Sequence, residues 1–288
     1  MYLSLEHYER PSTVEECLRL LHHPDEEAAI LAGGTELNVR GHEALERVVD
    51  IQGLGIDRLR VDRGEVRIGA GTTLARIAEH RGLAEPPMAA LREAALAFAN
   101  VAIQNRSTMG GRIMIDRPDQ DLPPALAVLG ARLRLAHFDR AEERVREVEI
   151  DYPTRDGARA ALEGALLLEV IIPVDGTDAS ALRRMGRSAV DAPLATVAVA
   201  IRGDRVRVAA NMQGSTADSL RLLEKTEALA SAWLSRRPEG WRDEARASLA
   251  AELEAYGDDW ASGEYRRDLG TTLGVRALAV LFGEEELS

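Results

Sequence analysis

The sequence predicts an α+β protein, because strand patterns and helix patterns both recur along the chain. Residues 59–61 and 66–68 alternate apolar and polar side chains on either side of Asp62–Gly64, which is the pattern of a β-hairpin. Residues 12–16 hold Ser and Thr three positions before Glu, and this spacing marks the capping box of a helix start. Apolar residues at helical spacing over 265–280 predict a last helix.

Each element of the first part has a local signal. The runs at 28–31 and 166–172 are continuously apolar and predict buried strands. Hydroxyl residues at Thr72–Thr73 favour a helix start, and so do the prolines at Pro86–Pro87 and Pro123–Pro124. In order, we expect a helix from residue 12 or 13, strands at 28–31 and 48–51, the hairpin, helices at 72–78 and 88–98, a helix from Asp121 or Leu122, and strands at 132–135, 145–150 and 166–172.

The composition changes near Asp175–Asp178, and this segment predicts a linker between residues 1–177 and 178–288. A chain of 288 residues is long enough for roughly two domains. Beyond the linker, strands at 195–201 and 206–210 flank a turn, and the remainder is predicted to be helical.

Composition excludes several classes of protein. With 48 acidic and 36 basic residues, the net charge is −12, which disfavours binding to nucleic acid or to an anionic membrane surface. No apolar run approaches the roughly 20 residues that a membrane helix needs, so we expect no membrane insertion. The start of the chain lacks the pattern of a signal peptide. The expected location is therefore the cytoplasm.

Two paired-glycine turns are the candidate binding elements. One spans Ala32–Leu37 and the other spans Asn105–Arg112, and each follows an apolar run. Glycine pairs adopt positive φ values, and successive N–H groups in such turns form a concavity that holds an anion. Because each turn also carries a Thr near its glycines, the pair predicts a ligand with more than one phosphate. The alternative is two tight turns without a ligand, since short glycine motifs also occur in turns that bind nothing.

The other chemically reactive residues carry weaker signals. Cys17 is the single cysteine, which excludes an internal disulfide and a thiolate-ligated iron–sulfur cluster within this chain. Its neighbours predict a small buried residue rather than a nucleophile. His22–His23 could be read as a metal site, although a solvated helix end is the simpler interpretation. We expect no catalytic acid–base pair of side chains.

Five segments, in this order, resemble one known family. They are Leu31–Leu37; Val49–Ile51 with Val66–Leu74; Ile103–Gly111 with Asp121–Leu126; Arg187 with Asp191–Ala192; and Glu264–Arg267 with Arg276–Leu278. Together they resemble the FAD-binding medium subunit of molybdenum hydroxylases, the family of carbon monoxide dehydrogenase and xanthine dehydrogenase. The first part resembles the flavin-binding fold of the vanillyl-alcohol-oxidase superfamily.

The resemblance implies a fold and a function. The fold is a two-subdomain vanillyl-alcohol-oxidase-type FAD-binding domain over 1–177, with subdomains of about 1–55 and 56–177. A C-terminal medium-subunit domain over 178–288, with an antiparallel sheet plus helices, follows it. The implied protein is an electron-transfer subunit with non-covalent FAD in a heterotrimer. The partners are an iron–sulfur small subunit with 2Fe-2S clusters and a large subunit with the molybdenum cofactor, and the acceptor is external, such as NAD or a quinone.

The resemblance also assigns the site. The backbone of Ala32 to Glu36 would hold one side of the FAD pyrophosphate, and Thr108 to Gly111, with the Thr108 hydroxyl, the other. Asp121 would accept a hydrogen bond from a sugar or ribityl hydroxyl, or else cap the following helix, and Asn105 would fix its loop. The segment 184–192 would lie near the flavin ring, with surface charge as the alternative role for Arg184 and Arg187. The implied cofactor-binding residues are Ala32, Gly33, Gly34, Thr35, Glu36, Leu37, Asn105, Thr108, Met109, Gly110, Gly111, Arg112, Asp121 and Arg187.

Two residues depart from the family pattern. Gln104 stands where the family often has Arg, and Arg112 stands where it often has Asn. Arg112 could add a cation beside the diphosphate, or the site could have drifted. A flavin-free structural subunit is therefore an alternative, as is a stand-alone FAD oxidoreductase on the same fold. A histidine-linked flavin is not expected, because the six histidines lie outside the motif turns.

Overall fold

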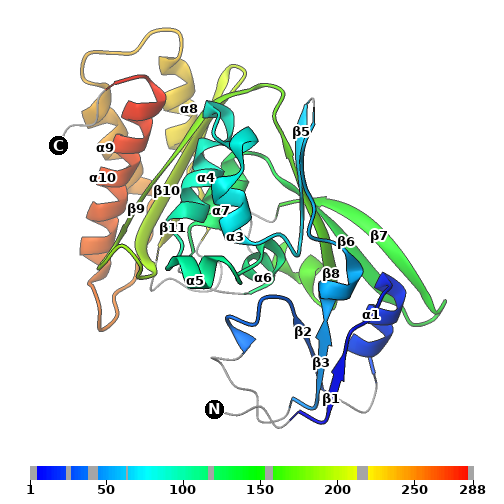
Figure 1. Cartoon of the computed structure of the whole chain (residues 1–288). Coiled ribbons are helices and arrows are strands. Elements are labelled where there is room, and N and C mark those ends of the chain that lie inside the picture. The colour runs from blue at the N-terminus through cyan, green and yellow to red at the C-terminus, as the bar shows by residue number, and fades with distance from the viewer. Residues whose placement is uncertain are drawn as a thin grey trace.

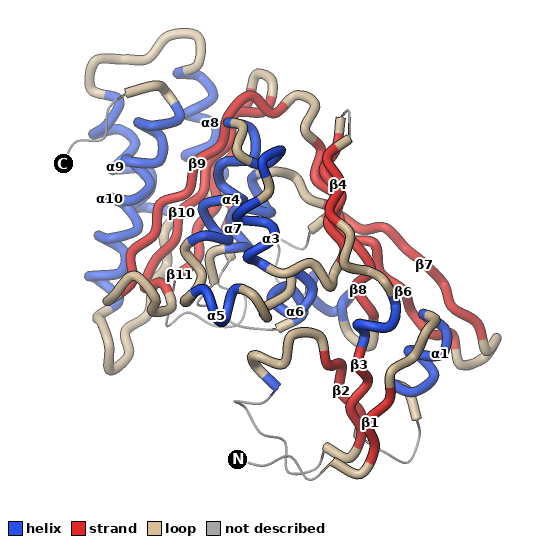
Figure 2. Tube along the Cα trace, in the orientation of Figure 1, coloured by secondary structure: helices blue, strands red, loops and turns tan. Residues whose placement is uncertain are grey.

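Three β-sheets organise the chain, and each is built from strands of one part of the sequence (Figure 1). The computed structural model describes residues 5–23, 27–37, 45–62, 64–115, 120–152, 158–212 and 220–284. Residues 38–40 lie outside this set, and so do Asp25, His42, Asp116–Arg117 and Gln213–Ser215. The helices and strands, coloured separately in Figure 2, give a mixed α+β protein, as the sequence predicts.

The N-terminal sheet is parallel and small. Its strand order is β1 (His7–Glu9), β3 (Arg47–Asp50), β2 (Ala28–Leu31). Helix α1 (Val14–Leu21) begins at Thr13, whose hydroxyl accepts a hydrogen bond from the Glu16 N–H, so the predicted helix start is confirmed. Buried α1 side chains pack with those of β3 and the central sheet, which fixes the N-terminal sheet against the rest of the chain.

The central sheet has five antiparallel strands in the order β4 (Leu59–Val61), β5 (Glu65–Gly69), β8 (Leu166–Pro173), β6 (Arg132–Asp139), β7 (Arg144–Asp151). The predicted hairpin and strands are confirmed. Side chains of β8 alternate between two cores: Leu166 and Leu168 face α1, whereas Leu167 faces the helices that follow β5. Strand β8 therefore lies between the two halves of the candidate site described below.

Short helices cover one face of the central sheet and lie between it and the C-terminal sheet (Figure 1). The predicted helix over 88–98 is shorter than expected, because its first residues form a 3₁₀ turn and it ends before Ala97. The helices are α3 (Leu74–Glu79), α4 (Ala89–Leu96), α5 (Val101–Gln104), α6 (Met109–Met114) and α7 (Leu122–Val128), with 3₁₀ helices η1 (Ile51–Leu54), η2 (Arg81–Leu83), η3 (Pro86–Met88) and η4 (Ala158–Leu162).

The C-terminal sheet is buried on both faces. Its antiparallel strands are β12 (Arg221–Leu222), β11 (Arg205–Met212), β10 (Pro193–Arg202) and β9 (Thr177–Gly186). Helices α8 (Glu224–Trp233), α9 (Trp241–Glu252) and α10 (Gly263–Leu281) cover one face, and α4 and α7 cover the other. Residues 198 and 200 of β10 therefore join the core of α4 and α7, while residues 197 and 199 join that of α8–α10.

The segment predicted as a linker, 175–178, is a short turn that runs into a strand. Thr177 and Asp178 begin β9, and Gly176, at φ 77°, lies in the turn between β8 and β9. The expectation of helices alone outside the 195–210 strand pair is wrong, because β9 and β12 complete a four-stranded sheet. The division of the chain into domains at 177/178 stays a prediction.

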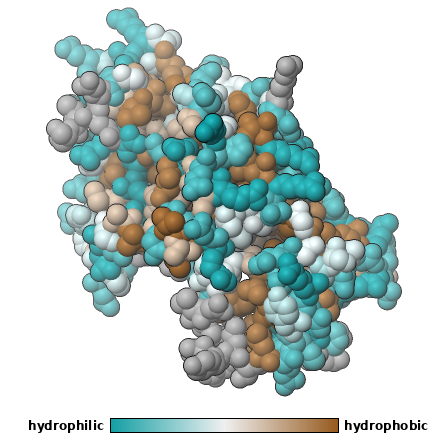
Figure 3. Space-filling model, viewed as in Figure 1, coloured by the Kyte–Doolittle hydropathy of each residue, from teal (hydrophilic) through white to brown (hydrophobic). Residues whose placement is uncertain are grey.

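The surface and the helices bear on the question of a membrane segment. In the view of Figure 3, hydrophilic side chains cover most of the surface, and apolar side chains form separate patches. Among the described residues, no helix is both long and apolar enough to cross a bilayer.

Cys17 is expected to resist thiol reagents in the folded protein. Its side chain is fully buried in the core under α1, and burial raises the pKa of the thiol to about 12. At neutral pH we expect labelling by a thiol-reactive dye only after unfolding in urea, measured by mass. Rapid labelling of the native chain would contradict a closed core at this helix.

Candidate functional site

The two glycine turns touch each other. The Arg106 guanidinium Nε donates to the Gly33 carbonyl at 3.1 Å, and the hydroxyls of Thr35 and Ser107 are 3.0 Å apart. A Cβ atom added at Gly33 would lie 1.7 Å from the Arg106 carbonyl oxygen. Only glycine permits this contact, which joins segments more than 70 residues apart in the sequence.

The first turn presents free hydrogen-bond donors. It follows the end of β2 at Leu31, and Gly34 has φ 71°. The N–H groups of Gly33, Gly34 and Thr35 have no acceptor among the described residues. Main-chain donors that are partly removed from water favour a partner, and neighbouring donors around a glycine at positive φ suit an anion. That this turn holds an anion stays a prediction.

The second turn is different, because its donors are already used. The N–H groups of Met109 and Gly110 each donate to carbonyls of the segment that follows β5, at 2.8 Å. The Gly111 N–H donates to the hydroxyl of Thr108, which is the N-cap of α6. The two turns are therefore not equivalent, contrary to our expectation. The first turn offers N–H donors to a ligand, whereas the N–H groups of the second turn are used within the fold.

The glycines of the second turn serve two purposes. A Cβ at Gly110 would lie 2.8 Å from the Ala70 Cβ, so this glycine permits close packing of α6. A Cβ at Gly111 would meet only the Thr108 hydroxyl, at 3.0 Å. Gly111 therefore leaves its space to the cavity beside it.

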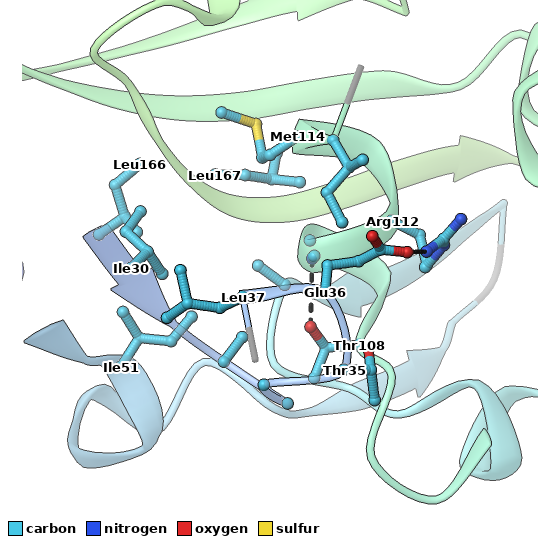
Figure 4. Close-up of a pocket in the computed structure, with 17 residues that line it drawn as sticks. Ile30, Thr35, Glu36, Leu37, Ile51, Thr108, Arg112, Met114, Leu166 and Leu167 are labelled. Atoms are coloured by element: carbon cyan, nitrogen blue, oxygen red, sulfur yellow. Dashed lines mark hydrogen bonds and ion pairs between the residues drawn. The ribbon is translucent and has the colours of Figure 1, made fainter. Parts of the chain in front are cut away.

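Both turns line one cavity of about 290 Å³ (Figure 4). One end is apolar and is formed by side chains of β2, η1 and β8 together with Leu37 of the first turn. The other end carries Glu36 and Arg112. The cavity thus offers an apolar compartment, free N–H donors and charged groups in succession. It is lined by Ile30, Ala32, Gly33, Gly34, Thr35, Glu36, Leu37, Ile51, Ala70, Thr108, Gly110, Gly111, Arg112, Met114, Ile115, Leu166 and Leu167.

An ion pair closes the charged end. The Arg112 Nη1 atom lies 2.9 Å from the Glu36 Oε1 atom, and the guanidinium stacks at 4.5 Å from the centre of the Phe98 ring. The Arg112 side chain is 4% exposed. Both charged residues also line a second cavity of about 160 Å³, together with Asp121 and Arg184. The two cavities therefore meet at this pair.

Asp121 lies in the second cavity and is held by two partners. The Thr196 hydroxyl donates to one carboxylate oxygen, and the Arg184 Nε atom lies 3.1 Å from the other. Burial raises the pKa of Asp121, while Arg184, Thr196 and Arg112 act in the opposite direction. Asp121 occupies the N-cap position of α7, but its side chain accepts no bond from that helix. Of the two predicted roles, side-chain capping is therefore wrong.

The two arginines of the 184–192 segment lie in different places. Arg184 lines the second cavity, and its guanidinium also donates to the carbonyls of Ala189 and Asp191. This arrangement fixes the loop between β9 and β10. Arg187 instead stacks on Trp260 at 3.4 Å and pairs with Asp191 at 3.8 Å, half-exposed. Arg187 lines none of the cavities described here, so the structure does not bring it to the predicted site.

Two polar residues of the second motif also depart from expectation. Gln104 donates its side-chain N–H groups to the carbonyls of Leu96 and Phe98, so it joins α5 to the end of α4 and does not face the cavity. Asn105 was expected to fix the loop, but its side chain bonds no backbone group among the described residues. It lines another cavity of about 440 Å³ with Arg106, and this cavity shares Ala32, Gly33, Ile51 and Thr108 with the first one. The side chain of Asn100, earlier in the same segment, accepts a hydrogen bond from the Ile103 N–H and caps α5.

Within the described ranges, no group of three or more His, Cys, Asp or Glu side chains could hold a metal ion. The His22 ring contacts the Leu18 carbonyl at 2.9 Å, which fits the reading of His22 as part of a helix end.

Comparison with known proteins decides the family. The family model for the FAD binding domain in molybdopterin dehydrogenase matches residues 3–175, which is more than half of the chain. The chain belongs to this family. The resemblance inferred from the sequence motifs is thereby confirmed.

Relatives of this FAD-binding family cover most of the chain. Protein YgfM of Escherichia coli is 31% identical over 220 residues, 76% of this chain and 78% of its own. The caffeine dehydrogenase subunit beta of a Pseudomonas species is 26% identical over 286 residues, 94% of this chain and 93% of its own. The structure of carbon monoxide dehydrogenase from Hydrogenophaga pseudoflava matches with a TM-score of 0.78 and 23% identity over 98% of this chain and 99% of that one.

Membership makes the chain an FAD-binding subunit of a dehydrogenase of the molybdenum hydroxylase type, and hence part of an oxidoreductase. The predicted fold class is confirmed by the likeness to the carbon monoxide dehydrogenase structure. The residues of the cleft fit an FAD in two respects. Within the part of the chain that the structure describes, three N–H groups of the first turn have no acceptor, and Gly111 leaves open the space that a Cβ would fill.

Proposed function

We propose that the cleft between the two glycine turns holds FAD without a covalent bond. The N–H groups of Gly33, Gly34 and Thr35 would bind the diphosphate. The apolar end, with Ile30 and Leu166, would take the adenine end, and the cavity with Asp121 and Arg184 would take the flavin ring. The single observation that carries the proposal is that three neighbouring N–H groups, without an acceptor among the described residues, line a cavity with one apolar and one charged end.

The proposed role is electron transfer within a complex. Bound FAD accepts and donates electrons, while the protein supplies binding, position and electrostatics. The chain would take electrons from an iron–sulfur small subunit, next to a molybdenum-cofactor large subunit, and pass them to an external acceptor such as NAD or a quinone. Support comes from the family and from relatives whose names describe them as dehydrogenase subunits.

We also propose that the protein is cytoplasmic and that its chain divides into two domains at 177/178. A single, buried cysteine suits the reducing cytoplasm, where disulfides are rare. The proposed division at 177/178 is supported by the change of sheet, since β8 ends at Pro173 and β9 begins at Thr177.

A second candidate function is a flavin-free structural subunit of the same kind of complex. The observation that favours it is the Glu36–Arg112 pair, which occupies the junction between the two cavities.

An absorbance spectrum of the purified chain separates the two candidates. We expect flavin bands, and release of about one FAD per chain into the supernatant after heat denaturation, identified by chromatography. A colourless chain that takes up no added FAD would contradict the flavoprotein proposal and favour the structural subunit. Retention of the Tm in that sample would show that the fold is intact.

A further inference from the structure

The Glu36–Arg112 ion pair stands where the two cavities meet. Glu36 comes from the first turn and Arg112 from α6, so the pair bridges both glycine motifs. Figure 4 shows the two side chains meeting at one end of the first cavity, opposite its apolar end. Both residues also line the cavity that contains Asp121. A ligand that occupies both cavities must pass this pair.

The pair is buried and closely packed. The two side chains are 4% and 17% exposed, and Phe98 lies against the guanidinium. In such surroundings the charges attract each other more strongly than in water, and either one left without a partner is costly. Separating the two charges therefore costs free energy unless another group replaces the lost partner.

The closed ion pair restricts the Arg112 cation but not the N–H donors of the first turn. With the pair closed, the Glu36 carboxylate satisfies the Arg112 guanidinium, so the cation is not fully available to a phosphate. The free N–H groups of Gly33 to Thr35 lie within the first cavity and need no change in the pair. A nucleotide diphosphate alone could therefore bind with the pair intact.

We infer that the Glu36–Arg112 pair is a gate between the nucleotide half and the flavin half of the cleft. This inference rests on the proposed FAD site. ADP fills the first cavity with the gate closed, whereas FAD, which spans both cavities, binds only when Arg112 leaves Glu36 and the Phe98 ring. Arg112 is then a residue that sets flavin affinity by its position, and not a fixed ligand of the diphosphate.

When only a fraction of the molecules has an open gate, the apparent affinity for FAD falls in proportion to that fraction. If about one molecule in ten is open, the apparent Kd for FAD is about tenfold higher than that of the open protein. The affinity for ADP carries no such factor. Opening the gate by substitution should therefore raise the affinity for FAD relative to that for ADP, and this ratio removes any effect that the substitution has on the diphosphate common to both ligands.

The test uses the full chain freed of flavin, titrated calorimetrically with FAD and, separately, with ADP. The variants are Arg112→Ala, which removes the gate, and Glu36→Gln, which keeps the size of the side chain and removes its charge. Arg207→Ala is the matched control, because Arg207 pairs with Glu227 at the same 2.9 Å but lies on β11, away from the cleft. Tm values establish that each variant is folded.

We expect the ratio of FAD affinity to ADP affinity to rise about tenfold in both variants. In the double variant the ratio should be no higher than in Arg112→Ala alone, because the gate is already absent. An unchanged or lower ratio in Arg112→Ala would overturn the gate, and a parallel loss of affinity for both ligands would indicate that Arg112 binds the diphosphate directly. Should Arg112→Ala fail to fold, Glu36→Gln alone decides. If the unaltered chain and all variants bind neither ligand, the FAD site itself is refuted, and the gate with it.

Discussion

Replacement of Gly33 by alanine is expected to abolish FAD retention and to lower the free energy of unfolding by about 3 kcal/mol, because close-packed sites tolerate no added methyl group. The new Cβ would lie 1.7 Å from the Arg106 carbonyl oxygen, so the two glycine turns would have to separate. Separation also breaks the contact between Thr35 and Ser107. Urea unfolding and the flavin absorbance of the purified variant measure the two effects.

Gly240→Ala is the matched control. Gly240 has φ −90° and no atom within 4 Å of its added Cβ, so this exchange should leave FAD bound and cost no more than about 1 kcal/mol, because Gly240 is the N-cap of α9, where Ala is less favourable than Gly. A Gly33→Ala chain that keeps stoichiometric FAD and full stability would show that the contact between the turns is not needed.

Gly111→Val separates the loss of ligand from the loss of fold. Its side chain would point into the cavity and meet only the Thr108 hydroxyl. We therefore expect loss of FAD with a Tm close to that of the unaltered chain. Both losses together in Gly111→Val would mean that this glycine supports the packing of α6, as Gly110 does against Ala70.

Local sequence patterns were sufficient to predict elements that have a strong hydrophobic period or characteristic turn and capping residues. The hairpin at Asp62–Gly64 and the cap at Thr73 are examples, because turn and capping residues act within a few positions of themselves. Strand β9 was missed, since Thr177–Gly186 holds alanines and arginines that are also good helix formers. Its strand state depends on pairing with β10, which local propensity does not report.

The sequence predicted the two glycine turns, but it did not show that their N–H groups differ in being free or already bonded. Which N–H groups are free depends on carbonyls of Ala70 and Thr72, some 40 residues earlier in the chain. The partners of Arg112 and Asp121 were hidden for the same reason, since Glu36 and Arg184 are distant in sequence. Phe98 carried no motif signal at all. Chemistry that needs a contact between distant segments follows from the fold and not from the motif.

Arg184→Ala is expected to destabilise the fold by about 3–5 kcal/mol at neutral pH, the usual cost of leaving one member of a buried ion pair alone. Asp121 is 3% exposed and lies 3.1 Å from the Arg184 Nε atom. Burial already raises the pKa of Asp121 above its ordinary 3.8, and Arg184 opposes this shift. Without Arg184, the pKa of the folded-state carboxyl rises further, and the Ala189 and Asp191 carbonyls lose their donor.

The sign of the pH dependence distinguishes this cause from a general loss of packing. Because the folded-state pKa of Asp121 is raised, the native chain holds a proton that the unfolded chain has released above about pH 4, so stability falls as pH rises through that window. The deficit of Arg184→Ala should therefore be smallest near pH 4 and grow toward neutral pH, measured by urea unfolding across the range. Adding Asp121→Asn to Arg184→Ala should recover much of the lost stability at neutral pH, because no buried charge is then left alone.

Arg19→Ala, at an exposed pair on α1, is the control and should cost about 0.5 kcal/mol or less at every pH. A deficit that is independent of pH and unaffected by Asp121→Asn would mean that Arg184 acts by holding the β9–β10 loop and not by neutralising Asp121.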